Sequence, residues 1–127
     1  MRTFIAAAVI FVGLGATAHA QQVMGSAPTF GGPTQNLVVC YYSNIGSSAV
    51  TFLSSVILVE PGNSVSEASE FCGGSIPAGG RCRTVSNAIV TNGAHWCRAV
   101  VSSKASLRGR MEVRNSSSVV LTSEEIR

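Results

Sequence analysis

The segment LRGRMEVR, residues 107–114, alternates between apolar or small residues and charged residues along its whole length. One set consists of Leu107, Gly109, Met111 and Val113, and the other of Arg108, Arg110, Glu112 and Arg114. Because successive side chains of a β-strand point to opposite faces, this period of two predicts a strand with one buried face and one solvent face.

Further strand signals lie elsewhere along the chain. Segment 36–43 is rich in valine and tyrosine, and its alternation places Val38, Cys40 and Tyr42 on one face and Leu37, Val39 and Tyr41 on the other. Segments 49–59, 81–87, 95–102 and 118–123 are also predicted strands, and 64–71 is either a polar edge strand or irregular. Turn residues separate these segments at 44–48 and 60–63, and a charged tail is expected at 124–127.

No segment carries an apolar stripe at helical spacing with caps at both ends. We therefore expect an all-β fold, an antiparallel sandwich of about six or seven strands around one core. Residues 36–127 would form this single domain. Residues 21–35 contain several glycines and prolines without a pattern, and we expect them to be a flexible lead-in.

The first 20 residues are predicted to be a cleaved signal peptide. Arg2 supplies a positive start, an apolar stretch follows up to Leu14, and Ala18-His19-Ala20 offers the small residues of a cleavage site. A membrane anchor is the rival interpretation, but the apolar stretch is shorter than the roughly 20 residues that span a bilayer. We expect a secreted or periplasmic protein without stable membrane insertion after cleavage.

Four cysteines, Cys40, Cys72, Cys82 and Cys97, remain after this cleavage. An even number in a short exported chain predicts two disulfides, and four cysteines allow three pairings. We favour Cys40–Cys97, which would join two core strands, and Cys72–Cys82, which brackets a glycine-rich bend. A zinc site is the competing use, but the spacing contains no C-x-x-C pair, so we expect no metal.

Cys40 on an early strand and Trp96-Cys97 on a late strand resemble the inter-sheet disulfide arrangement of immunoglobulin-like sandwiches. Two features depart from that pattern: Trp96 adjoins the second cysteine, and no tyrosine lies two residues before Cys97. The order of strands and turns over 36–115 is also similar to small exported bacterial sandwich proteins of unassigned role. The resemblance implies a fold and assigns no site.

Charge composition argues against a nucleic-acid partner. Residues 21–127 contain seven arginines, one lysine and six glutamates, a formal charge of 7 + 1 − 6 = +2. Nucleic-acid binders usually concentrate far more positive charge, so we expect no nucleic-acid partner.

Catalytic constellations are also missing from the sequence. His95 is the single histidine after residue 20, no aspartate exists, and no G-x-S-x-G motif occurs, which argues against a serine hydrolase. Glu60, Glu67, Glu70 and Glu112 lie in predicted turns or on solvent faces, where paired carboxylate catalysis is not expected. We expect neither an enzyme nor a cofactor.

Two surfaces are candidates for binding. Arg108, Arg110 and Arg114 share one face of a strand and form a candidate anion-binding face for an unknown protein or glycan. The competing explanation is that these charges protect an exposed edge strand from aggregation. The second surface is the loop between Cys72 and Cys82, where Ile76 is the single hydrophobic anchor.

Two hypotheses follow. In the first, the chain is an exported, non-catalytic binding or envelope-associated module. In the second, it is a small secreted enzyme or inhibitor that acts through the loop between Cys72 and Cys82. A concave site that joins His95 to a glutamate or to that loop would favour the second hypothesis.

Overall fold

The computed structural model describes residues 20–65 and 68–127, which contain ten strands and no helix. The strands are β1 (Gln22–Gly25), β2 (Gln35–Asn44), β3 (Val50–Val59), β4 (Asn63–Ser64), β5 (Ser69–Glu70), β6 (Ser75–Ile76), β7 (Arg81–Ser86), β8 (His95–Val101), β9 (Leu107–Asn115) and β10 (Val120–Ile126). The predicted signal segment, apart from Ala20, lies outside the described residues.

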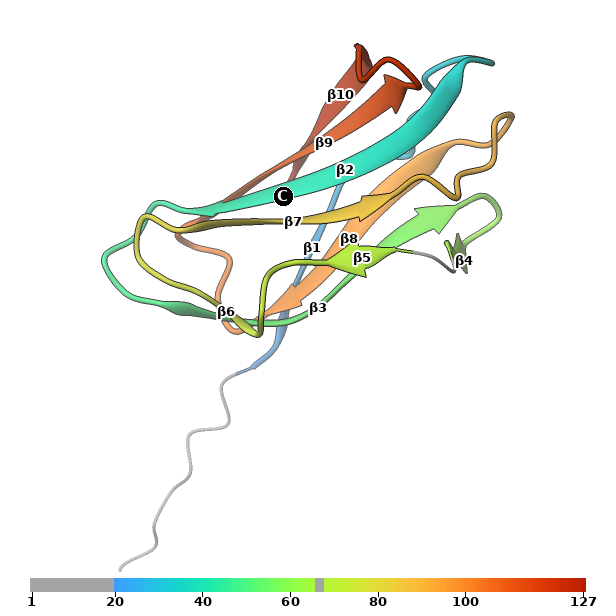
Figure 1. The fold of residues 1–127 in the computed structure, drawn as a ribbon. Helices are drawn as coiled ribbons and strands as arrows, with labels where there is room; N and C mark the ends of the chain where they lie inside the picture. Colours follow the sequence, from blue (N-terminus) through green and yellow to red (C-terminus); the bar gives the residue numbers. More distant parts are fainter. Residues whose placement is uncertain (1–19, 66–67) are drawn as a thin grey trace, which may run out of the picture.

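The strands form two antiparallel sheets that face each other as layers (Figure 1). Sheet A has the order β1-β8-β3-β4, and β6 pairs with one end of β3. Sheet B has the order β10-β9-β2-β7-β5. The chain crosses repeatedly between the sheets, because β2, β7 and β9 belong to sheet B whereas β3 and β8 belong to sheet A.

The expected number of six or seven strands is wrong, since the described residues contain ten. The strands β4, β5 and β6 have two residues each, too few to produce a visible alternation in the sequence. β1 was not anticipated either: it arises within segment 21–35 by pairing with β8, and its Met24 is buried. The expected charged tail is also a strand, because β10 continues to Ile126 along β9.

The two strands with the clearest patterns form as predicted. On β9, Leu107, Met111 and Val113 are buried, and on β2 the inward residues Val38, Cys40 and Tyr42 are buried, as is Val39 on the other face. These strands pair along nearly their whole length, with Cys40 opposite Met111. Their inward side chains therefore supply the sheet B half of the core.

The core lies between the sheets and is crossed by a disulfide. Cys40 on β2 bonds to Cys97 on β8, and both residues are fully buried. Next to this link the rings of Tyr42 and Phe52 lie 4.9 Å apart between centroids. Burial raises the pKa of Tyr42 to about 12, and its hydroxyl is 2.9 Å from that of Ser55.

The second disulfide, Cys72–Cys82, ties the chain after β5 to β7, so the structure has the pairing favoured from the sequence. Gly73 and Gly74 have positive φ angles of 61° and 80°, which glycine adopts without steric cost. The bend that follows is anchored by Ile76, which is buried and pairs with Val50 of β3. Both disulfides therefore restrain the position of sheet B.

Candidate binding face

The outer face of sheet B carries most of the arginines of the chain. The pairing register places Tyr41 of β2 directly between Arg83 of β7 and Arg110 of β9. One pair further along, Ser43 lies between Arg81 and Arg108. Directly opposed residues in a sheet point to the same side. The arginines of β7 and β9 therefore start from the same surface, on either side of β2.

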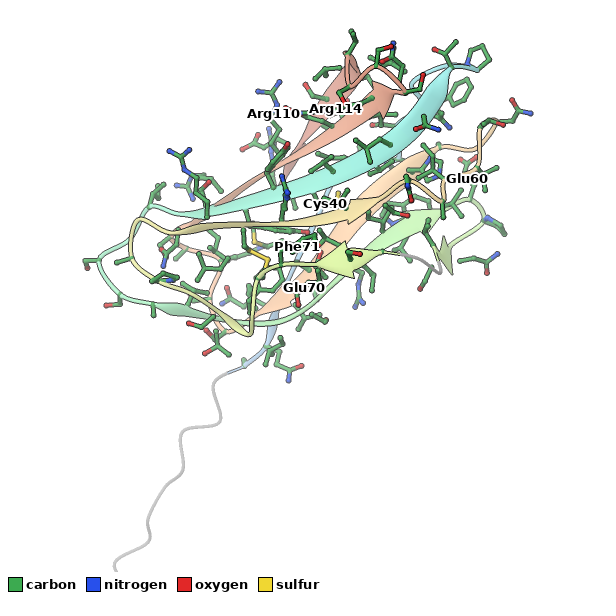
Figure 2. All side chains as sticks on the ribbon, in the orientation of Figure 1. Cys40, Glu60, Glu70, Phe71, Arg110 and Arg114 are labelled. Atoms are coloured by element: carbon green, nitrogen blue, oxygen red, sulfur yellow. A yellow bond between two sulfur atoms is a disulfide. The ribbon has the colours of Figure 1, made fainter. Side chains whose placement is uncertain are left out.

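We use the name arginine face for this surface. It consists of Arg81, Arg83, Arg110 and Arg114, the aromatic residues Tyr41 and Phe71, and Glu112. Figure 2 shows Arg110 and Arg114 on β9 and Phe71 at the end of β5. The face therefore draws its residues from four strands or their ends.

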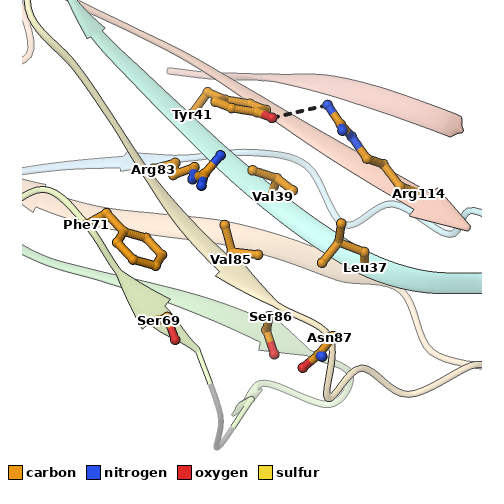
Figure 3. Close-up of a pocket in the computed structure, with 10 residues that line it drawn as sticks. All are labelled: Leu37, Val39, Tyr41, Ser69, Phe71, Arg83, Val85, Ser86, Asn87 and Arg114. Carbon is orange, nitrogen blue, oxygen red and sulfur yellow. Dashed lines mark hydrogen bonds between the residues drawn. The ribbon is translucent and has the colours of Figure 1, made fainter. Parts of the chain in front are cut away.

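Glu112 organises the β9 side of the arginine face. Its carboxylate accepts hydrogen bonds from Nε and from a terminal nitrogen of Arg114, and it lies 3.4 Å from Nε of Arg110. The hydrogen bond that Arg114 donates to Glu112 raises the pKa of the Arg114 guanidinium above its usual value. Arg114 also donates to the Tyr41 hydroxyl at 3.1 Å (Figure 3). These contacts hold the Arg114 guanidinium beside Tyr41.

The β7 side of the arginine face has a different electrostatic character. Arg81 and Arg83 flank Cys82 and are both exposed, because alternation turns them away from the disulfide. Neither forms an ion pair with a residue that the structure describes. The guanidinium carbon of Arg83 lies 5.5 Å from the centre of the Phe71 ring, within the range of a cation–π contact.

A hollow of about 400 Å³ opens between the two sides of the arginine face (Figure 3). Its floor is aliphatic, and Tyr41, Phe71, Arg83 and Arg114 line it together with polar residues. The floor residues are Leu37, Val39 and Val85, and the polar residues are Ser69, Ser86 and Asn87. Phe71 is 61 % exposed, unusual for a ring of this size, so an apolar surface lies open beside the cations.

The structure separates the three arginines that the sequence grouped. Arg110 and Arg114 lie near Tyr41 on the arginine face. Arg108 donates instead to the carbonyl oxygens of Ala105 at 3.3 Å and Leu107 at 2.7 Å, at the beginning of β9. Its guanidinium is therefore held by backbone acceptors and is directed away from the hollow.

Sequence reasoning did not assign Arg81, Arg83, Tyr41 or Phe71 to this face. The alternation of β7 signals that Arg81 and Arg83 share a side, but the pairing of β7 with β2 is a long-range property. Phe71 reaches the face because β5 adds to the edge of sheet B, and β5 is too short to predict.

Among the residues that the structure describes, His95 forms no concave site with a glutamate or with the loop between Cys72 and Cys82. The imidazole is fully buried, and its Nε2 accepts a hydrogen bond from the Val90 N–H at 3.2 Å. Burial lowers the pKa of His95.

Two of the glutamates considered from the sequence, Glu60 and Glu70, are exposed. Glu70 accepts a hydrogen bond from the backbone N–H of Cys72. The position of Glu67 lies outside the described residues.

Within residues 20–65 and 68–127, no three His, Cys, Asp or Glu side chains are grouped so that they could hold a metal ion. The same ranges contain no helix long and apolar enough to cross a membrane. The two disulfides are consistent with an oxidising compartment outside the cytoplasm. The fold defines an all-β protein of two antiparallel sheets, and no protein-family model, curated protein or solved structure matches the chain.

Proposed function

We propose that the chain is a non-catalytic, secreted or periplasmic binding module whose arginine face holds an anionic partner. The observation that carries this proposal is the position of Tyr41 between Arg83 and Arg110. Four arginines share a small surface there with Glu112. Glu125 of β10 lies opposite Arg110 and is paired with Arg127. Guanidinium groups bind carboxylates and phosphates through paired hydrogen bonds.

The position of the arginines within the sheet supports binding over protection of an edge. Charged side chains on edge strands commonly prevent aggregation. β9, however, lies between β10 and β2, and β7 lies between β2 and β5. Arg110 and Arg114 therefore have no free backbone edge to protect, because β9 is paired on both sides at these positions. β5 pairs with β7 only at Thr84 and Val85, so the argument rests on β9.

The disulfides support the same proposal by keeping the face rigid. Cys82 lies between Arg81 and Arg83 and is tied to Cys72, while Cys40 next to Tyr41 is tied to the opposite sheet. A preorganised surface loses less conformational entropy when it binds. In this proposal the molecule is an immunoglobulin-like sandwich, in which the Cys40–Cys97 link joins interior strands of the two sheets.

The test is a titration with an oligoglutamate peptide, followed by NMR on residues 21–127. We expect backbone shifts centred on Tyr41, Arg83 and Arg110. The double variant R83E/R110E should weaken the affinity at least about tenfold, because charged hydrogen bonds contribute about 1.5–3 kcal/mol each.

Arg98→Glu is the matched control, because Arg98 is an exposed arginine on sheet A. This variant should keep the affinity of the unchanged protein. Equal losses in R98E and in the separate single variants R83E and R110E would show attraction by net charge alone. That result, or shifts spread over both sheets, would refute the proposal.

A further inference from the structure

Building on this proposed function, we infer that the partner is an acidic protein segment that inserts one apolar side chain into the hollow. Carboxylates on either side of that side chain would contact Arg83 and Arg110. The inference rests on the aliphatic floor and the exposed ring of Phe71, features that an anion alone does not require.

The hollow offers an apolar surface at the centre of a cationic one. Leu37, Val39 and Val85 project from neighbouring strands onto the same side and form its floor (Figure 3). Phe71 borders this floor, and Arg83 packs against its ring. Val39 is only 3 % exposed, so the apolar surface open to a ligand belongs to Leu37, Val85 and Phe71. Covering this surface with an apolar side chain is favourable, because it removes apolar surface from water.

The residue types match the centre of a protein interface. Tyrosine, phenylalanine and arginine are enriched in such centres, and lysine is depleted. The arginine face has Tyr41, Phe71 and four arginines, whereas Lys104 lies near Arg108 at a different hollow. Ser69 and Asn87 add polar groups to the lining, as expected at the rim of an interface.

The same features argue against two other anionic ligands. A sugar acid could hydrogen-bond to Ser69 and Asn87 at the side of the hollow, but its hydroxyl groups over the aliphatic floor would find no hydrogen-bond partner there. A lipid needs room for its acyl chains, and a hollow of about 400 Å³ is at the lower end of the usual ligand pockets of roughly 300–1,000 Å³. A single apolar side chain flanked by carboxylates can enter the hollow without filling it, and it matches the charge of the face.

The test compares the peptides acetyl-Glu-Glu-Leu-Glu-Glu-amide and acetyl-Glu-Glu-Gly-Glu-Glu-amide, which carry equal charge. We expect the leucine peptide to bind about tenfold more tightly, since one buried leucine side chain supplies about that factor. Methyl NMR signals of Leu37, Val39 and Val85 should shift with the leucine peptide and stay in place with the glycine peptide.

Phe71→Ala should remove the advantage of the leucine peptide, measured within this variant as the ratio of the affinities for the two peptides. Phe30→Ala is the control, because Phe30 is similarly exposed at 51 % and does not line the hollow. This control should preserve the advantage. Thermal unfolding of both variants would verify that each retains its fold.

The outcomes distinguish this inference from the proposed function. Equal affinity for the two peptides would overturn the inference and leave an anion-binding face. No binding of either peptide or of oligoglutamate would overturn both. Tighter binding of an oligogalacturonate, or of phosphatidylglycerol vesicles, than of the leucine peptide would overturn the inference in favour of a glycan or a membrane surface.

Discussion

The outer faces of the two sheets follow the same alternation but carry different chemistry. On sheet A, the cross-strand pairs Leu58–Trp96 and Val56–Arg98 point outward, and Val23 lies opposite Val100. Arg98 is the single Arg, Lys or Glu residue in β1, β3 and β8. On sheet B, β7 and β9 alone contribute five arginines and one glutamate.

This difference shows what the strand pattern does and does not determine. Alternation decides which side chains leave the core, and it acts equally on both sheets. The pairing of strands then decides which outward residues become neighbours. Arg83 and Arg110 come from segments of the chain separated by β8, and they meet around Tyr41 because β2 lies between their strands.

The largest expected effect compares the disulfide that joins β2 to β8 with the disulfide beside Arg81 and Arg83. Replacing Cys40 and Cys97 by alanine should lower the free energy of unfolding by about 4 kcal/mol, because that bond closes a loop with a sequence separation of 57. Replacing Cys72 and Cys82 should cost about 3 kcal/mol, because the separation is 10. Urea unfolding of the two double variants measures both values.

The two double variants should also differ in what they do to binding. At temperatures where both remain folded, loss of Cys72–Cys82 should weaken oligoglutamate binding, since Cys82 positions Arg81 and Arg83. NMR shifts on the outer face of sheet A should stay unchanged in that variant. Equal destabilisation by the two losses, with shifts in both sheets, would show that the second disulfide is not local to sheet B.

Much of sheet B could be predicted from the sequence, whereas its site could be predicted only in part. The alternation of β9 and β2 identified the inward residues, such as Met111 and Tyr42, because a period of two is a local signal. The arginines of β9 were found for the same reason. Their partners across β2 and the ring of Phe71 were missed, because strand order and the pairing of β5 depend on contacts between distant segments.

Sheet A was harder to predict at its edges. β1, β4 and β6 are held by β8 and β3 and have little pattern of their own. Glu112 shows a second limit: it was expected on a solvent face, yet it is only 9 % exposed. The period of two already places Arg110 and Arg114 beside it, but its low exposure also depends on the pairing of β9 with β2 and β10, which no local rule reveals.

Tyr41 and Tyr42 are adjacent in the sequence but lie on opposite sides of sheet B. Replacing each by phenylalanine tests this assignment of sides, with a smaller expected effect. Tyr42→Phe should cost about 1 kcal/mol of stability, because it removes a buried hydrogen bond to Ser55. Tyr41→Phe should cost less, since the hydroxyl that accepts from Arg114 is partly solvated, but it should weaken oligoglutamate binding by releasing that guanidinium. Thermal unfolding and NMR titration of the two variants measure the two effects. A larger stability loss for Tyr41→Phe would contradict the assignment of sides.

The smallest expected effect is a dependence of stability on pH. It arises from a buried residue on the core side of sheet A and does not involve the arginine face. His95 on β8 is buried, and burial lowers its pKa below the usual 6.5, so the folded protein binds a proton less readily than the unfolded chain. Its contribution to stability is therefore fully present above pH 6.5 and is lost as the pH falls from there toward the folded-state pKa. Protonation of His95 Nε2 would also turn the acceptor of the Val90 N–H into a donor. The loss of this hydrogen bond should loosen segment 87–94. Urea unfolding between about pH 8 and pH 5 should show this loss in the unchanged protein.

His95→Gln is the matched variant, because a glutamine oxygen can still accept a hydrogen bond but does not titrate. Its stability should vary less over the same pH range, and the difference between the two proteins isolates the contribution of His95 from that of the other titratable groups. Oligoglutamate affinity should change equally with pH in both proteins, because His95 lies beneath sheet A and the arginines lie on the outside of sheet B. A parallel loss of stability in the glutamine variant would assign the pH dependence to other groups.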